Sequence, residues 1–271
     1  MNYETGTPEL LAEVTNSVGI LTLNRPDRRN ALYFPVIDAL ASVLAEWERD
    51  PTIGAIVITG AGSAFSAGGD IKVMSNDLEG REAVSYDIAV HEQRLRQRAT
   101  TERLMRMPKI TIAAIPGAAA GMGLSLALAC DLRYASRSAV LTTAFGKVGL
   151  SGDYGASWLL TQIVGSARAR QMLYFSEIVS ADDAKAIGLI NDVFADDDLL
   201  DGARQRAEQI AAGPLVAYRY MKENLNRAMG DGLRDAMDLE VTHHIHTMST
   251  ADHREATSAF VEKRPPRFRG R

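Results

Sequence analysis

Cysteine is almost absent from this chain of 271 residues, which contains only Cys130. A single thiol excludes an internal disulfide framework, and its apolar surroundings predict a small buried side chain. Long hydrophobic runs are missing too, because no apolar stretch reaches the roughly 18 residues that a membrane-spanning helix needs. The first ten residues, MNYETGTPEL, lack the basic and then apolar layout of a secretory signal. These absences predict a soluble, cytoplasmic protein that does not interact with a membrane.

An excess of charge of one sign is also lacking. The 30 basic and 34 acidic side chains give a formal net charge of −4. Because no basic stripe is interleaved with aromatic residues, nothing favours a nucleic-acid partner. His243, His244 and His246 lie close together, but their spacing places only two of them on one helix face, and no nearby carboxylate completes a metal site. We therefore expect no metal.

The first two thirds of the chain alternate short apolar strands with helices. The predicted strands lie at Leu10–Thr15, Val18–Leu23, Gly54–Thr59, Ile110–Ile115, Leu132–Ala135 and Ala139–Leu141, with a short extension at Leu189–Phe194. The predicted helices lie at Phe34–Arg49, in the polar stretch Asp77–Met107, from about Trp158, at Ser166–Phe175, and at Ala181–Ile187 with Ser180 as its N-cap. This alternation, with crossover connections, predicts an α/β fold with a strand-rich spiral core and helices outside it.

The chain from Asp196 onward shows helical patterns only. Four helices are predicted, at Leu199–Ala212, Pro214–Met229, Leu233–Met248 and Ala251–Glu262. We therefore divide the chain into a core, residues 1–195, and a helical C-terminal region, residues 196–271.

Two stretches rich in small residues each follow an apolar strand and continue into a predicted helix. They are Ala64–Met74 (AFSAGGDIKVM) and Pro116–Asp131 (PGAAAGMGLSLALACD). Glycine at such a turn lets a ligand approach backbone N–H groups that have no partner within the helix, which suits a negatively charged oxygen. From the residues alone, tight packing of helix on strand remains the alternative reading.

Together with two further motifs, these stretches resemble the enoyl-CoA hydratase/isomerase (crotonase) superfamily. The further motifs are NRPDRRNAL at residues 24–32 and AFVEKRPPRF at residues 259–268. The resemblance runs in order from about Leu10 to Phe268. It implies a crotonase-like spiral of ββα turns with a C-terminal helical trimerisation region, in a homotrimer or a dimer of trimers. It also implies an acyl-CoA thioester substrate, with coenzyme A as part of that substrate and no permanently bound cofactor.

The resemblance assigns roles to particular residues. It implies that the backbone N–H groups of Gly69 and Met122 form an oxyanion hole for the thioester oxygen. The residues implied to border the coenzyme A portion are Arg29, Ala31, Ala67, Gly68, Asp70, Ile71 and Lys72, with Phe260 and Lys263 closing over it from the same or a neighbouring subunit. Arg25 and Arg28 accompany Arg29, and the cluster is read either as phosphate-binding or as a solvated surface. Asp70 is expected to be structural rather than catalytic.

The sequence departs from the hydratases of this family at both catalytic glutamates. Ser125 and Phe145 stand at these positions, and neither side chain acts as a carboxylate base. One acid remains in the matching loop, Asp153, at a place where isomerases and dehalogenases of the family carry an aspartate. Its alternative role is to cap the next helix. An apolar pocket would raise its pKa, and Ser125 and Tyr154 are candidates for orienting it or the substrate.

Four functions remain open at this point. The favoured one is a double-bond isomerase in which Asp153 moves a proton while Gly69 and Met122 hold the enolate. The second is an enoyl-CoA hydratase that uses Asp153 in place of the glutamate pair. The third is an acyl- or aryl-CoA hydrolase or dehalogenase with Asp153 as the nucleophile. The fourth is an acyl-CoA binder that has lost catalysis.

Overall fold

The computed structural model of the chain describes residues 2–73 and 85–270, and within them the strands form two sheets. The larger sheet has the order β1-β2-β3-β4-β6-β8-β11 and the smaller one β10-β9-β7-β5. The larger contains β1 (Asn2–Tyr3), β2 (Leu10–Thr15), β3 (Val18–Leu23), β4 (Ala55–Gly60), β6 (Ile110–Ile115), β8 (Leu132–Ser136) and β11 (Asp192–Phe194). The smaller contains β5 (Ala64–Ser66), β7 (Ala118–Ala120), β9 (Val140–Thr142) and β10 (Val179–Ser180).

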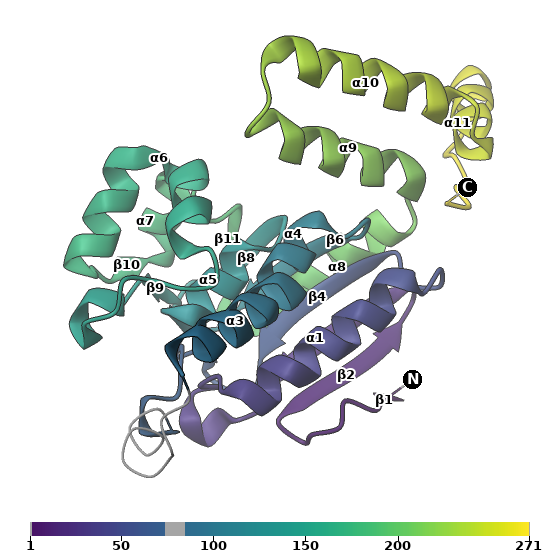
Figure 1. The fold of residues 1–271 in the computed structure, drawn as a ribbon. Helices are drawn as coiled ribbons and strands as arrows, with labels where there is room; N and C mark the ends of the chain where they lie inside the picture. The colour runs from purple at the N-terminus through teal and green to yellow at the C-terminus, as the bar shows by residue number, and fades with distance from the viewer. Residues whose placement is uncertain (1, 74–84, 271) are drawn as a thin grey trace.

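Each turn of the chain gives one strand to each sheet and then a helical segment. The strand pairs are β4 and β5, β6 and β7, and β8 and β9, and neighbouring turns pair in parallel in both sheets. The segments after them are α3 (Tyr86–Gln97) with the π-helical turn η2 (Arg98–Glu102) and α4 (Arg103–Arg106), then α5 (Met122–Leu128), then η3 (Phe145–Val148) with α6 (Ala156–Phe175). This arrangement confirms the predicted spiral of ββα turns (Figure 1).

Helices cover both faces of the larger sheet. Strand β4 is buried along its whole length, as its uninterrupted apolar sequence predicts for a parallel strand between two layers. On one face lies α1 (Phe34–Arg49), which has the predicted bounds and contributes to the main core. On the other lies α8 (Leu199–Ala211), whose Ala203 and Ala207 pack in a core cluster with Val57. The first of the four predicted C-terminal helices therefore packs directly on the sheet.

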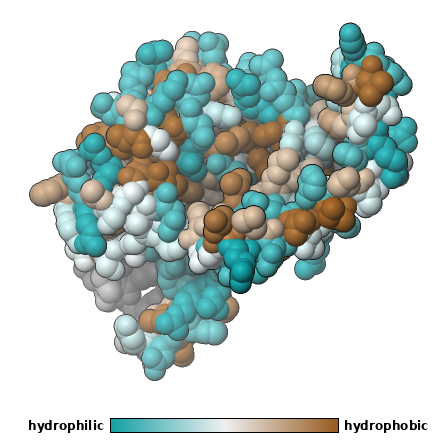
Figure 2. Space-filling view, turned by 90° about the horizontal axis from the view of Figure 1, so that it is seen from above, coloured by the Kyte–Doolittle hydropathy of each residue, from teal (hydrophilic) through white to brown (hydrophobic). Residues whose placement is uncertain are grey.

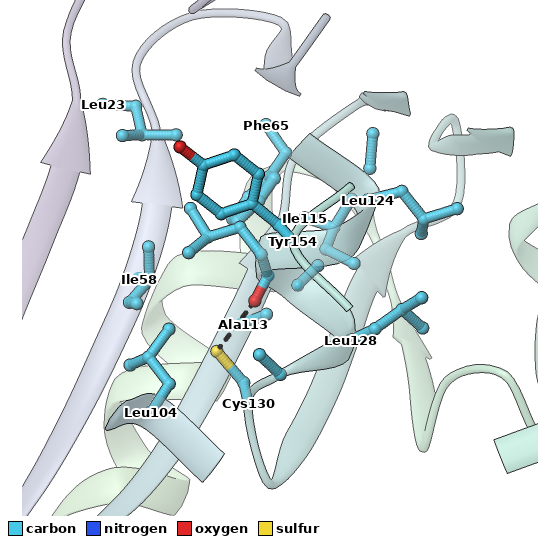
Figure 3. Close-up of a cluster of buried hydrophobic side chains, with 14 of the residues drawn as sticks. Leu23, Ile58, Phe65, Leu104, Ala113, Ile115, Leu124, Leu128, Cys130 and Tyr154 are labelled. Atoms are coloured by element: carbon cyan, nitrogen blue, oxygen red, sulfur yellow. Dashed lines mark hydrogen bonds between the residues drawn. The ribbon is translucent and has the colours of Figure 1, made fainter. Parts of the chain in front are cut away.

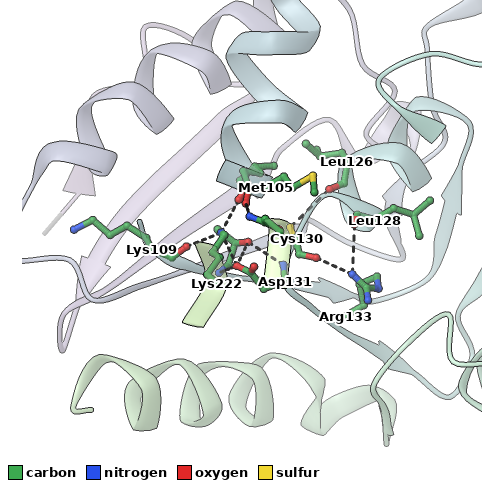
Figure 4. Close-up of polar contacts among 11 residues, drawn as sticks. Met105, Lys109, Leu126, Leu128, Cys130, Asp131, Arg133 and Lys222 are labelled. Carbon is green, nitrogen blue, oxygen red and sulfur yellow. Dashed lines mark hydrogen bonds and ion pairs between the residues drawn. The ribbon is translucent and has the colours of Figure 1, made fainter. Parts of the chain in front are cut away.

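The last three helices project from the rest of the chain (Figure 1). They are α9 (Leu215–Ala228), α10 (Leu233–Met248) and α11 (Ala251–Glu262). The buried Lys222 of α9 attaches them to the core, because its Nζ donates to the Leu104 and Lys109 carbonyls at 2.7 and 2.8 Å and lies 2.7 Å from Asp131 Oδ2 (Figure 4). The division at residues 195 and 196 stays a prediction, since α8 covers the sheet while α9 to α11 project.

The remaining elements differ from the predictions only in detail. Helix α6 joins the two helices predicted from Trp158 and from Ser166, and its backbone is non-helical at Gly165. Helix α7 (Ala181–Ala186) has the predicted N-cap, because Ser180 Oγ accepts the Asp183 N–H. The helical prediction for residues 77–107 is confirmed from residue 86 to residue 106, and its start lies outside the described residues. The short 3₁₀ segments η1 and η4 lie at Pro26–Arg28 and Asp196–Asp198.

Cys130 lies in the main core, as its apolar surroundings predict (Figure 3). Its Sγ donates to the Leu126 carbonyl, and burial raises the thiol pKa to about 12. The thiol therefore stays protonated and unreactive near neutral pH. Among the residues that the structure describes, no helix is long and apolar enough to span a lipid bilayer.

Replacing Lys222 with methionine should destabilise the fold. The change leaves two carbonyls and the Asp131 carboxylate without their buried partner, which is expected to cost about 3 kcal/mol of unfolding free energy. Chemical denaturation at matched protein concentration measures the effect. The control is Arg227→Met on the same helix, an exposed position where the change should stay within about 0.5 kcal/mol. Equal stability of the two variants would refute the anchoring role of Lys222.

Candidate active site

Gly69 presents a free backbone N–H in a short parallel pairing between two loops. The Leu32 N–H donates to the Gly68 carbonyl at 2.7 Å, and the Leu32 carbonyl accepts the Asp70 N–H at 2.8 Å. In parallel pairing the middle residue directs its own N–H away from the partner segment. No described residue accepts a hydrogen bond from the Gly69 N–H. This N–H is therefore available to a ligand, as the sequence predicts.

Met122 supplies a second N–H next to this loop. It is the first residue of α5, so its N–H has no acceptor within the helix. A β-carbon at Gly68, whose φ is +93°, would lie 2.8 Å from the Ala120 carbonyl oxygen and 3.5 Å from the Met122 nitrogen. Only glycine therefore lets the two loops approach this closely. The structure brings the two predicted oxyanion-hole segments together.

Two polar residues that the sequence analysis did not single out hold these loops in place. Ser66 Oγ accepts the Gly68 N–H at 3.1 Å and donates to the Asn30 carbonyl at 2.8 Å. Asn30 is buried in the left-handed conformation at φ +55°, and its Nδ2 donates to the Ala64 carbonyl at 2.7 Å. A β-carbon at Gly123 would lie 2.6 Å from that of Ser66, so α5 packs directly on this support. The tolerance of asparagine for this backbone conformation is the signal in the sequence that marks Asn30.

Asp153 has a buried carboxyl oxygen. Its Oδ1 is inaccessible to water and has no hydrogen-bond partner among the described residues. Burial raises the pKa of this carboxyl from its usual 3.8 to about 6, because desolvation disfavours the charged form. Buried polar atoms in proteins almost always have a partner, so an exception requires an explanation.

The Asp153 loop is fixed to α5 and to the core on either side of the carboxyl. Ser125 Oγ, one turn after Met122, lies 3.1 Å from the Asp153 carbonyl oxygen and donates to it, sharing its proton with the Gly121 carbonyl at 3.2 Å. Tyr154 has a φ of +48° and points its ring into the core, near Phe65 and Leu124 (Figure 3). Such a backbone costs about 1–3 kcal/mol and persists only where its surroundings impose it.

Phe145 lies between the turn before α5, which contains Gly121, and the loop that contains Gly152 and Asp153. Its ring lies 3.7 Å from where a β-carbon of Gly121 would be and 3.9 Å from the corresponding position at Gly152. The side chain is buried, so this wall of the site is apolar. Gly69, Met122 and Asp153 therefore lie on three loops that meet around Phe145 and Ser125.

The segments predicted to border coenzyme A are neighbours in the structure. The Ala67 N–H donates to the Arg29 carbonyl at 2.8 Å, next to the pairing of Leu32 with Gly69. On this surface the exposed residues are Arg29, Ala67, Ile71 and Lys72, and Ala31 is partly exposed. Their contact with the coenzyme stays a prediction.

Two other residues of these motifs have partners within the chain. Asp70 Oδ1 accepts the Val73 N–H at 3.3 Å, and its Oδ2 lies 3.1 Å from Arg25. The same arginine also pairs with Glu9 and donates to the Ala31 carbonyl. Arg25 is thus neutralised by its own chain, which leaves Arg28 and Arg29 as the exposed members of the arginine cluster. The contacts of Asp70 are those of a helix cap and an ion pair.

Phe260 and Lys263 lie at the end of the projecting helices. Figure 1 shows α11 far from α3 and α5, so these residues do not approach Gly69 or Met122 of the same chain. The Phe260 side chain is 85% exposed. An apolar cavity of about 400 Å³ lies between α9 and the end of α5, and its wall includes Cys130 and Lys222 but not Gly69, Met122 or Asp153. No group of three or more possible metal ligands occurs among residues 2–73 and 85–270.

Known proteins share both this sequence and this fold. The family model described as enoyl-CoA hydratase/isomerase matches residues 13–271. The chain is 37% identical over 262 residues to the 1,2-epoxyphenylacetyl-CoA isomerase of Escherichia coli, which covers 97% of this chain and 98% of that protein. It is 36% identical over 254 residues to the mitochondrial enoyl-CoA hydratase of Pongo abelii, which covers 94% of this chain and 84% of that protein.

Solved structures agree with the sequence comparison. A crystal structure described as a putative enoyl-CoA hydratase from Streptomyces coelicolor superposes with a TM-score of 0.91 at 34% identity, covering 98% of this chain and 96% of that one. Another, of a putative enoyl-CoA hydratase/isomerase from Mycobacterium abscessus, has a TM-score of 0.91 at 30% identity and covers 97% of this chain and 100% of that one. The chain therefore has the crotonase fold and belongs to the enoyl-CoA hydratase/isomerase family.

Proposed function

We propose that this protein is a one-base isomerase that moves a double bond within an acyl-CoA thioester. The observation that carries the proposal is the buried Oδ1 of Asp153, which has no partner among the described residues and belongs to a carboxyl with a pKa of about 6. A proton shuttle needs a carboxyl that gains and loses a proton near neutral pH. Ser125 and Phe145 provide no second carboxylate on the facing positions.

In the proposed mechanism Asp153 removes a proton from the α-carbon of the acyl group, next to the thioester carbonyl, or from the γ-carbon of a conjugated enoyl group. The negative charge passes to the thioester oxygen, where the N–H groups of Gly69 and Met122 stabilise it. Such paired backbone donors are typically worth about 10²–10³ each in rate. The protonated Asp153 then returns the proton to another carbon on the same face, and the double bond has moved.

Hydration with Asp153 as the only acid and base is the second candidate. The names of relatives support it, because the mammalian relative is called an enoyl-CoA hydratase. The apolar Phe145 wall opposes it, since an attacking water needs polar groups to hold and orient it. The name of the E. coli relative, 1,2-epoxyphenylacetyl-CoA isomerase, supports isomer formation.

We also propose that the working form is a homo-oligomer, a trimer or a dimer of trimers. Hydrophobic residues reach the surface in the view onto the projecting helices (Figure 2). Those exposed along α10 are Leu233, Met237, Val241, Ile245 and Met248. A stripe of this kind is typical of an interface. In such an assembly Phe260 and Lys263 would close over the coenzyme A of a neighbouring subunit. The cytoplasmic location stays a prediction.

Asp153→Asn should abolish proton exchange. Purified protein is incubated in heavy water with CoA thioesters of short, branched and arylacetyl acids, and deuterium uptake is read by mass spectrometry. The amide cannot take a proton, so the exchange rate should fall by about 10²–10⁴. Asp182→Asn, an exposed change on α7, is the matched control. Tight thioester binding by the wild type without exchange, hydration or a covalent adduct on Asp153 would favour the non-catalytic binder instead.

The isomerisation rate should depend on pH with a single break near 6. Asp153 acts as a base only when ionised, so kcat/KM, which reports the pKa of the free enzyme, should rise tenfold per pH unit below that pKa and level off above it. The raised pKa places the break about two units above that of an ordinary aspartate. A pH profile of kcat/KM measures it. A break near 4 would mean that the carboxyl of the free enzyme is solvated.

Ser125→Ala should lower kcat while leaving KM nearly unchanged. The variant removes the hydroxyl that fixes the Asp153 carbonyl, so the carboxyl is held less firmly, and we expect a loss of about 5–10-fold. The break in the pH profile should shift as well, because a looser loop changes the solvation of Asp153. Ser136→Ala is the control, since Ser136 is equally buried but donates to the Pro116 carbonyl. Equal kcat for both variants and the wild type would contradict a positioning role for Ser125.

A further inference from the structure

A solvent-open groove lies directly behind the Asp153 loop. Its volume is about 550 Å³, and its wall includes Tyr154 and Gly155, the two residues that follow Asp153 in the chain. Cavities of this size are typical of small-molecule sites. The groove therefore borders the chain immediately after Asp153.

The floor of this groove is apolar. Met105 of α4 and Trp158 and Leu159 of α6 line it. Trp158 is 45% exposed, although large aromatic side chains on monomeric surfaces are usually covered more fully. A chain of methylene groups lying on this floor would be removed from water together with the indole ring.

The rim of the groove is positively charged. Four arginines line it, Arg94, Arg98, Arg106 and Arg227. Arg106 pairs with Glu102 at 3.0 Å, and Arg227 lies 3.8 Å from Asp231. For Arg94 and Arg98, no ion pair with any residue of the described ranges 2–73 and 85–270 occurs. Four positive charges thus face two negative ones, and Arg94 of α3 and Arg98 of η2 are the two that no acidic residue of the described ranges neutralises.

The helix that carries these two arginines is irregular where it borders the groove. Residues Arg98–Glu102 form a π-helical turn between α3 and α4, and Thr101 of that turn is buried and lines the groove. Single π-turns inside helices are costly and occur frequently at functional sites. The turn sets the direction in which Arg98 leaves the helix relative to Arg94, one helical turn earlier.

We propose that this groove binds the far end of the acyl group and that this end carries a carboxylate. The substrate class is then the CoA monothioester of an unsaturated dicarboxylic acid. The inference rests on the proposed isomerase function, because it places the reacting carbons at Asp153 and the rest of the acyl chain beyond Tyr154. The guanidinium groups match a carboxylate in charge and in planar geometry, and the apolar floor fits the methylenes between the two ends. A methyl-ended chain would leave the arginines without a partner.

The test compares matched thioesters that differ only at the far end. CoA thioesters of 3-enoic acids are prepared at three chain lengths, each ending in a methyl group or in a carboxylate. We expect kcat/KM for the carboxylate-ended thioester to be higher by about 10–100-fold at one length or more, as for one or two charge-assisted hydrogen bonds. Equal values at every length would overturn the inference and would point to a groove covered by another copy of the chain.

Two double variants separate the groove from surface charge in general. Arg94→Gln with Arg98→Gln should remove the preference for the carboxylate and leave the rate with methyl-ended thioesters unchanged. Arg168→Gln with Arg170→Gln, exposed on α6 and outside the groove, should retain the preference. If the Arg94→Gln, Arg98→Gln variant still prefers the carboxylate-ended thioester, these arginines do not bind the carboxylate.

A binding measurement keeps this test separate from the proposed reaction. Calorimetry with Asp153→Asn compares the affinities of the two thioesters without turnover. A 10-fold or greater preference for the carboxylate, lost in the Arg94→Gln, Arg98→Gln background, supports the groove even if no double bond moves. If methyl-ended thioesters are isomerised and the two kinds of thioester bind with equal affinity, the proposed role of the groove is wrong and the proposed isomerase function still holds.

Discussion

A carboxyl oxygen that is kept from water and has no partner among the residues that the structure describes is the constraint around which the site is built. Asp153 keeps its Oδ1 buried, and the pKa of the carboxyl rises because the charged form is poorly solvated. A folded chain retains such a group only where the surrounding contacts hold it. Here the hydroxyl of Ser125 holds the loop from one side and the buried ring of Tyr154 holds it from the other.

The two-sheet spiral explains why the loop of Asp153 lies next to the segments that contain Gly69 and Met122. Parallel pairing of β5 with β7 and of β7 with β9 places the loops that follow these strands side by side. Gly69 follows β5, Met122 follows β7, and Asp153 lies in the loop after β9. Helix α5 then connects two of them, because it begins with the free N–H of Met122 and carries Ser125 one turn later. The geometry of the site is thus a consequence of strand register rather than of any long-range flexible contact.

Most of the fold could be predicted from the sequence, whereas the chemical roles of Gly69, Met122 and Asp153 stay predictions. Uninterrupted apolar runs marked the parallel strands, and glycines next to them marked the turns where N–H groups are free. Asp153 was singled out because the family resemblance places it in the loop of Phe145, where it is the one acid left once both family glutamates, at the positions of Ser125 and Phe145, are missing. Asn30 and Ser66 were not found, since their roles depend on hydrogen bonds between loops that are about 35 residues apart, and short sequence patterns do not carry such contacts. The sequence also could not predict that α11, which carries Phe260, lies far from the site of the same chain, because this depends on the direction in which α9 to α11 leave the core.

The central claim is that one carboxyl both removes and returns the proton, and a label-transfer experiment tests it most directly. A 3-enoyl-CoA carrying deuterium at the carbon between the thioester and the double bond is converted in ordinary water, and the product is analysed by NMR for label at the carbon that receives the proton. A shuttle through Asp153 predicts that part of the deuterium appears there, because a proton held in a dry pocket returns before it exchanges fully with solvent. A product without transferred deuterium that, in a parallel incubation in ¹⁸O-labelled water, contains oxygen from the water would contradict the claim and identify the protein as a hydratase.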